Sequence, residues 1–171
     1  INFLPSPLEV KSIEGEGPDG ETISRKSDPK EKLAGLVFKL MSDSFVENLA
    51  FVRVYSGKLS VGDKIYNPVK KKQEKISKLM KLHANKREEV QEILAGDIGA
   101  IVGLKFTTTG DTLCDQKALI RFESVVFPEP VISIAIEPRS TADSDKLMKS
   151  LERLMTEDPS FRVSYNPETA Q

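Results

Sequence analysis

The stretch LKFTTTGDTLCD, residues 104–115, contains the densest group of side chains that could take part in chemistry. Four threonines, two aspartates and the only cysteine of the chain lie within its twelve positions. Hydroxyl, thiol and carboxylate groups could form a nucleophilic site if a neighbouring base activated one of them. The same residues also fit a turn, because Gly110 tolerates a positive φ and Asp111 can accept hydrogen bonds from backbone amides. The surrounding elements have to decide between a reactive site and a turn.

The chain offers few other groups for catalysis or metal binding. His83 and Cys114 are the only residues of their kinds, and a nucleophilic pair would need both side chains within hydrogen-bond reach. Cys114 alternates with Leu113 and fits a small strand residue better. One histidine and one cysteine do not make a zinc site. We therefore expect no catalytic and no metal-binding residues.

The sequence also lacks a phosphate-binding loop. No GxxxxGK[ST] motif occurs, and no strand–glycine–helix unit offers aligned backbone amides. The letters NKRE at 85–88 match a guanine-reading Asn-Lys-x-Asp element only in part, because Glu88 stands where aspartate belongs. We therefore expect no cofactor-binding residues in this chain.

Positive charge is concentrated in one segment, although the net charge is only −1. Residues 70–87, KKKQEKISKLMKLHANKR, contain eight Lys or Arg residues and the single acid Glu74. Such a segment can attract a polyanion such as RNA, because neutralising phosphates releases condensed counterions. It can equally be a solvated, lysine-rich strand edge that discourages pairing between sheets. Charge alone leaves both interpretations open.

Length and composition limit the fold class. With 171 residues, 39% hydrophobic and 30% charged, the chain fits one ordinary globular domain or two small ones. No run of about 18 apolar residues occurs, so no bilayer span is expected. One cysteine cannot form an internal disulfide, which fits a reducing cytoplasm. The first residues show neither a signal peptide nor an initiator methionine, so we expect an excised piece of a longer protein.

The chain begins with a polar segment and continues with a β-rich part. Residues 11–32 combine three glycines, two prolines and eleven charged residues, which predicts a linker or surface loop. From Leu33, short apolar or alternating runs separated by turn residues predict a small closed β-barrel. Gly57 and Gly62 lie in a tight connection and are expected to take positive φ angles. The six runs are LAGLVFKL, NLAFVRVYSG, DKIYNP, EKISKLMKL, IGAIVGL and ALIRF.

Residues 85–97, NKREEVQEILAGD, do not follow this strand pattern. Val90, Ile93 and Leu94 have helical spacing, and Gly96 could end a helix. The pattern by itself predicts a short helix. A barrel would instead require an irregular loop that leads into a strand.

A second structural unit is predicted after the sequence FPEP. Residues 131–138, VISIAIEP, place three isoleucines on one face of a strand. A helical stripe follows, with Asp143 or Ser144 near its start and Pro159 beyond its end. Residues 161–165, FRVSY, alternate like a second strand. These elements are the opening half of an α+β sandwich, which we expect to be marginally stable alone.

Five stretches together resemble bacterial-type elongation factor G. They are, in order along the chain, VRVYSGKLSVGD, HANKREEV, AGDIGAIVGLKFTTTGDTLCD, FPEPVISIAIEP, and EDPSFRV with NPET. The resemblance implies a mostly β fold, in which a small translation-factor β-barrel is followed by a truncated α+β domain of the ferredoxin-like βαβ type. Residues 1–32 would be the exit segment of an absent GTPase domain and a linker, 33–124 the barrel domain II, and 125–171 the N-terminal part of domain III. The resemblance also places a barrel connection at TTTGDTLCD, and a barrel loop and strand at 85–97.

The resemblance implies a function for the parent protein. The family drives GTP-dependent movement of transfer RNA and messenger RNA through the ribosome and assists ribosome recycling. The parent would be a cytoplasmic, monomeric GTPase that uses GTP and Mg, and this fragment would have no catalytic activity of its own. Its expected partners are small-subunit ribosomal RNA and protein, together with the GTPase and distal domains of its own chain, and no membrane.

Charge and resemblance together give a hypothesis for the side chains that contact ribosomal RNA. They are Arg53, Lys58, Lys70, Lys71, Lys72, Lys75 and Lys78. The segment Asp43–Leu49 departs from the DPFVGKL-like pattern of the family, with Glu47 and Asn48 in place of the glycine and the basic residue. We therefore assign no phosphate contact to that segment.

Two other functions remain open on the sequence. A related translational GTPase, either a recycling paralogue or a ribosomal protection protein, would share the barrel. A stand-alone adapter that binds RNA or protein is the alternative from a different class, although a truncated domain III argues against it. A small enzyme that uses Cys114 is the least favoured interpretation.

Overall fold

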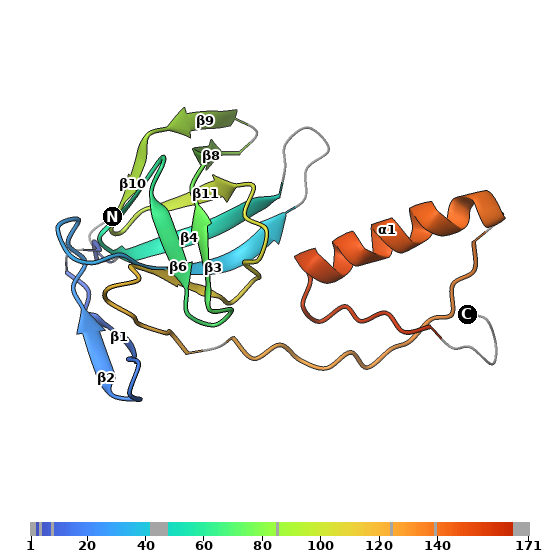
Figure 1. Cartoon of the computed structure of the whole chain (residues 1–171), viewed down its shortest axis with the longest axis horizontal. Coiled ribbons are helices and arrows are strands. Elements are labelled where there is room, and N and C mark those ends of the chain that lie inside the picture. The colour runs from blue at the N-terminus through green and yellow to red at the C-terminus, as the bar shows by residue number, and fades with distance from the viewer. Residues whose placement is uncertain are drawn as a thin grey trace. The chain divides into compact units, whose positions relative to one another are not determined.

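The computed structural model describes most of the chain and divides it into two compact units, residues 1–124 and residues 125–171 (Figure 1). The described residues are 3, 5–7, 9–41, 48–84, 86–123, 125–138 and 140–165. Most of the segment Asp43–Leu49 lies outside the described residues. Among the residues that are described, no helix is long and apolar enough to cross a membrane.

The first unit is built on an eight-stranded antiparallel sheet with the strand order β7-β6-β12-β3-β4-β11-β8-β9. Alternate residues of its strands, such as Val52 and Val54, are fully buried in one core cluster together with Ile65, Ile101 and Leu113. The mostly β fold class is confirmed. The strands are β3 (Ala34–Met41), β4 (Leu49–Ser56), β6 (Lys64–Asn67), β7 (Lys72–Lys75), β8 (Lys78–His83), β9 (Lys86–Val90), β11 (Ile98–Val102) and β12 (Thr112–Cys114).

A short strand pair covers one end of this core. β5 (Lys58–Ser60) pairs with β10 (Glu92–Leu94), and both Leu59 and Ile93 are fully buried. The connections that flank β5 contain Gly57 with φ 71° and Gly62 with φ 93°. The positive φ angles expected at both glycines are confirmed.

The short helix predicted by the pattern of residues 85–97 is wrong. β9 forms a hairpin with β8, in which His83 faces Lys86 and Leu79 faces Val90, and β10 follows directly. Val90 packs against the core from β9, and Ile93 enters the core from β10. A break between two strands has therefore produced a spacing that looks helical.

Residues 11–32 also differ from the predicted loop, because they contain a hairpin. β1 (Ile13–Glu16) pairs with β2 (Thr22–Arg25), and an isolated bridge joins Glu16 to Arg121. Ile13 and Ile23 pack against a second buried cluster, made of Ala34, Cys114, Ile120 and Phe122. Each strand contributes only one large apolar residue, so the polar composition of the segment gave no sign of the hairpin.

The second unit contains the predicted helix. α1 (Thr141–Glu157) begins after Ser140, whose hydroxyl donates to Asp143 Oδ2 at 2.7 Å, and it ends before Asp158 and Pro159. Leu151 is buried, whereas Met148, Leu154 and Met155 are partly exposed. The helix and its C-terminal boundary are therefore as predicted, whereas its start lies a few residues before the predicted Asp143 or Ser144.

The two strands predicted beside this helix do not form in the described part of the unit. Residues 131–138 and 161–165 pair with no strand, and Ile132 and Ile134 are largely exposed. A strand needs a neighbour to accept and donate its backbone hydrogen bonds, and two separate segments with one helix provide too little sheet. This outcome agrees with the marginal stability expected for half of an α+β sandwich.

Candidate nucleic-acid interface

The lysine-rich turn between β6 and β7 is fixed by a buried asparagine. Asn67 Oδ1 accepts hydrogen bonds from the backbone amides of Val69 and Lys70, both at 3.0 Å. Its Nδ2 donates to Asp111 Oδ2 at 2.9 Å. Asn67 therefore holds the turn from its own side and ties it to the loop before β12. An Asn-Pro dipeptide stands at 67–68, and such dipeptides favour turns.

The loop at residues 104–111 is held by two carboxylates. Asp111 Oδ2 accepts from the amide of Thr108 at 2.8 Å and from its hydroxyl at 3.1 Å. Glu74 accepts from the amide of Lys105 at 2.6 Å and from the hydroxyl of Thr107 at 2.7 Å. Gly110 takes a φ of 91°. The turn interpretation is confirmed for residues 107–111, whereas residues 112–114 form β12. The hydroxyls of Thr107 and Thr108 shape the loop, but Thr109 Oγ1 is buried and has no hydrogen-bond partner among the described residues.

Four of the seven hypothesised RNA-contacting residues lie together at this place. Lys70 and Lys71 are in the turn and Lys72 and Lys75 are on β7, all of them exposed. We call these four lysines the basic edge. Within the part of the chain that the structure describes, no ion pair joins any of them to an acid.

The other three hypothesised residues lie elsewhere and have local partners. Lys58 Nζ is 2.9 Å from Glu92 Oε2, and this hydrogen bond and charge pair raises the pKa of Lys58. Lys78 Nζ is 2.8 Å from Glu89 Oε2. The guanidinium of Arg53 lies 5.0 Å from the centre of the Tyr55 ring. The structure therefore gathers four of the seven cations and separates the rest.

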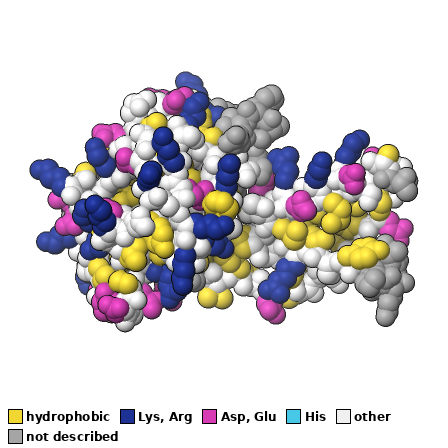
Figure 2. All heavy atoms as spheres, in the orientation of Figure 1, with side chains coloured by type: hydrophobic (Ala, Val, Ile, Leu, Met, Phe, Trp, Pro, Cys, Tyr) yellow, Lys and Arg dark blue, Asp and Glu magenta, His cyan; other side chains and the backbone are white. Residues whose placement is uncertain are grey.

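The arrangement of cations extends beyond the predicted residues. Figure 2 shows Lys and Arg side chains spread over the visible face of the barrel, with hydrophobic side chains between them. Lys64 lies directly opposite Lys75 in the β6–β7 pair, and Lys72 Nζ is 3.7 Å from the centre of the Phe106 ring. Sequence reasoning missed Lys64 and Phe106, because neither is marked out by a motif.

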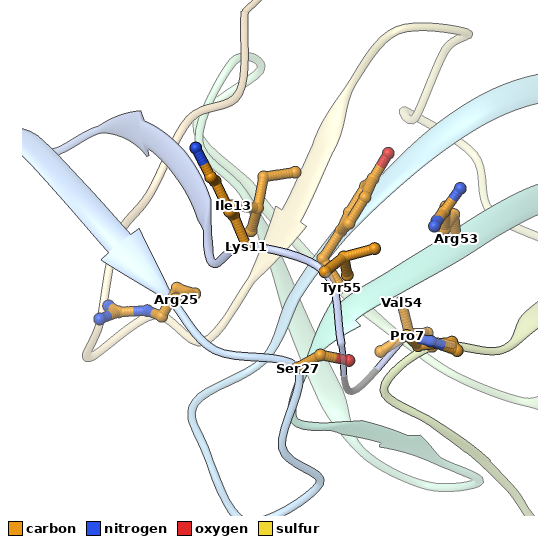
Figure 3. A pocket seen from close by; sticks show the side chains of 10 residues that line it. Pro7, Lys11, Ile13, Arg25, Ser27, Arg53, Val54 and Tyr55 are labelled. Atoms are coloured by element: carbon orange, nitrogen blue, oxygen red, sulfur yellow. The ribbon is translucent and has the colours of Figure 1, made fainter. Parts of the chain in front are cut away.

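A small hollow beside Arg53 lacks the arrangement of an anion site. It is lined by Lys11, Arg25 and Arg53 together with Ser27 and Tyr55, among others. In the close view of Figure 3, the charged ends of Lys11, Arg25 and Arg53 point in different directions and do not converge on one place. Three cations that diverge cannot surround one anion.

The structure places His83 and Cys114 on different parts of the sheet. Cys114 lies on β12, between β6 and β3, whereas His83 ends β8, between β11 and β9. Burial raises the pKa of the Cys114 thiol, which keeps it in its unreactive protonated form. Among the described residues, no group of three or more His, Cys, Asp or Glu side chains could hold a metal ion.

The Cys114 thiol is expected to react with Ellman's reagent at pH 8 only when the protein unfolds, since it is fully buried. Reaction rates of the thiol in buffer and in urea test this expectation. A native rate equal to the denatured rate would contradict the burial.

The same burial makes stability depend on pH, because the pKa of the Cys114 thiol is higher in the folded state. The thiol's contribution to the free energy of unfolding is fully present below the unfolded pKa of about 8.5 and is lost as pH rises above it.

Comparisons with known proteins agree with this architecture. The family model for elongation factor G domain 2 matches residues 32–116, and the model for elongation factor G domain III matches residues 127–171. A crystal structure of a protein from Thermus thermophilus superposes with a TM-score of 0.68 and 25% sequence identity, over 81% of this chain and 21% of that one. The fold and both matches therefore define a piece of a translation-factor-type protein.

One curated relative matches the whole chain. Elongation factor G 2 from Desulfotalea psychrophila is 68% identical over all 171 residues, which span 25% of the relative's length. With two matched domains in the family's order, the chain belongs to the elongation factor G family. The chain therefore represents about a quarter of the length of its curated relative.

Proposed function

We propose that this chain is the ribosome-docking and coupling portion of an elongation factor that drives GTP-dependent movement of transfer RNA and messenger RNA on the ribosome and assists ribosome recycling. The observation that carries the proposal is the identity of 68% to elongation factor G 2 across the whole chain. In this proposal the parent protein is a cytoplasmic GTPase that acts as a monomer. GTP and Mg belong to its GTPase domain, and residues 1–171 only contribute binding surface.

The proposal assigns a role to each part of the chain. Residues 1–32 would connect to the GTPase domain, residues 33–124 would be domain II, and residues 125–171 would begin domain III. The matched family ranges and the two compact units support this division. Domain II would dock on the small subunit, and domain III would pass nucleotide-dependent rearrangements to the distal domains.

The basic edge is the proposed contact with ribosomal RNA. Lys64 and Lys75 face each other across two strands, and like charges directly opposite destabilise a sheet. An anionic partner that covers this edge would relieve the repulsion and gain counterion release. Arg53, Lys58 and Lys78 remain secondary candidates, because a phosphate would have to compete with the partners that they already have.

Charge reversal of Lys70 and Lys71 to glutamate is expected to weaken binding to small ribosomal subunits. Each lost phosphate contact should reduce the slope of log affinity against log salt by about one unit, so the double variant should lose about two. Co-sedimentation with small subunits across a salt series, with intact factor as competitor, measures this slope. The turn should stay intact, because Asn67 holds it through backbone amides.

A double variant with the same change in charge provides the control. Lys26 and Lys30 are exposed residues of the same unit that lie outside the basic edge. Their reversal to glutamate changes the net charge equally and should leave the salt slope within error of the wild type. Equal effects of the two double variants would mean that only net charge matters, and the docking assignment would fail.

A further inference from the structure

Phe106 is an exposed aromatic residue of the first unit, in the loop between β11 and β12. The residue is 45% exposed, although burying an aromatic ring is usually favourable. It lies in the loop before β12, next to Lys105. The Lys72 ammonium lies over its ring, with Nζ 3.7 Å from the ring centre. An exposed ring among lysines is the combination that single-stranded nucleic acids recognise through base stacking and phosphate contacts.

The loop holds the backbone of Phe106 in place. The amide of Phe106 donates to Glu74 Oε2 at 3.3 Å, and the neighbouring amide of Lys105 donates to the same oxygen at 2.6 Å. Further along the loop, Asp111 fixes Thr108 and is itself bound by Asn67. The ring therefore extends from a loop whose backbone is already fixed by hydrogen bonds. This preorganisation lowers the conformational entropy that the loop would lose on binding a ligand.

The position of Lys72 shows that one face of the ring is accessible. The ammonium lies over that face, so core side chains do not fill the place. A planar base can occupy it if Lys72 turns toward a phosphate, which is a stronger partner for a cation than a ring. An apolar protein partner would instead have to cover Lys70, Lys71 and Lys72 and desolvate their charges.

We propose that Phe106 is a stacking platform for an unpaired RNA base, with Lys70, Lys71 and Lys72 binding the adjacent phosphates. This inference rests on the proposed RNA docking and specifies its chemistry. Bases are available for stacking in single-stranded loops, bulges and ends, and not inside an A-form helix. The ligand class is therefore single-stranded RNA.

The variant Phe106→Trp places a single fluorescent tryptophan at the proposed stacking position, because the chain contains no other tryptophan. Adding an unpaired oligoribonucleotide of about 12 nucleotides, a length on the order of one binding-site size, is expected to quench the tryptophan fluorescence in a saturable manner. An RNA duplex of the same composition should leave it unchanged. Phe38→Trp is the matched control, since Phe38 is 41% exposed on β3 and packs near Phe51. Equal quenching at both positions would overturn the proposal.

Phe106→Leu removes stacking and keeps apolar bulk. Its affinity for the oligoribonucleotide is expected to fall by about 5-fold to 100-fold with an unchanged salt slope, whereas Phe106→Tyr should bind like the wild type. Equal urea midpoints of the two variants confirm that both are folded.

The outcomes separate the platform from the docking surface. If Phe106→Leu binds RNA as tightly as the wild type while the Lys70 and Lys71 double variant binds weakly, docking stands and the platform is wrong. If the wild type binds neither the oligoribonucleotide nor small subunits, both the proposed docking and the platform fail. Two further results would overturn the platform. In the first, Phe106→Leu loses equal affinity for single-stranded and for duplex RNA. In the second, Phe106→Leu loses affinity for a ribosomal protein and binds RNA like the wild type.

Discussion

An alanine at Gly57 is expected to lower the free energy of unfolding of the first unit by about 4 kcal/mol, because both the left-handed backbone and steric overlap oppose a side chain there. The φ of Gly57 is 71°. A Cβ atom would lie 2.7 Å from the backbone nitrogen of Leu33 and 2.8 Å from the carbonyl oxygen of Glu31. Backbone atoms cannot rotate aside as a flexible side chain can, so the segment before β3 would have to move.

The matched comparison is Gly62, which has a φ of 93° and no heavy atom within 4 Å of a Cβ position. Alanine there meets only the conformational cost, and we expect a loss of about 1 kcal/mol. Urea unfolding followed by circular dichroism measures both variants, since the midpoint reports the change in stability when the slope is unchanged. Similar losses in the free energy of unfolding at the two glycines would show that the backbone near Leu33 moves at little cost, and the steric argument would be wrong.

Asp111→Ala is expected to cost about 3 kcal/mol, because buried donors that lose their acceptor keep the full penalty of desolvation. Asp111 is 4% exposed and its Oδ2 accepts three hydrogen bonds, from Asn67 Nδ2 and from the amide and hydroxyl of Thr108. The variant should also weaken RNA binding, since the turn with Lys70 and the loop with Phe106 are joined through this carboxylate. Thermal and urea unfolding measure the first effect, and oligoribonucleotide binding measures the second.

Asp63→Ala is the control for this prediction. Asp63 is an exposed aspartate whose Oδ2 accepts one backbone hydrogen bond, from Ser60 at 3.1 Å. Its removal should cost less than about 1 kcal/mol and leave RNA binding unchanged, because water can satisfy the exposed amide. A loss as large as that of Asp111→Ala would indicate a general role of turn aspartates, and the buried network would not be special.

Local sequence patterns predicted the elements whose signals are complete within a few residues. The turn glycines at 57, 62 and 110 have the expected positive φ angles. The helix that follows Ser140 appears where its apolar spacing predicted it. These features depend on backbone preference and on short-range periodicity, and neither needs distant partners.

Local patterns failed where a partner far along the chain decides the structure. The hairpin at residues 13–25 is stable because Ile13 and Ile23 pack on the cluster around Cys114 and Phe122. Residues 131–138 have a strong strand pattern, yet they pair with nothing in the described part of their unit. Pairing, more than propensity, decides whether an extended segment becomes a strand.

Four features could be read from the sequence without coordinates: the mostly β fold, the turn character of residues 107–111, the concentration of lysines at 70–78 and membership of a translation-factor family. Which cations act together depends instead on contacts between distant parts of the chain. Asn67 and Asp111 are 44 positions apart, and Glu74 and Lys105 are 31 apart. These long-range hydrogen bonds bring Phe106 to Lys72, while Lys58 and Lys78 are paired with acids on neighbouring strands. A sequence shows how many charges lie in a segment, but strand pairing decides which of them have already been neutralised.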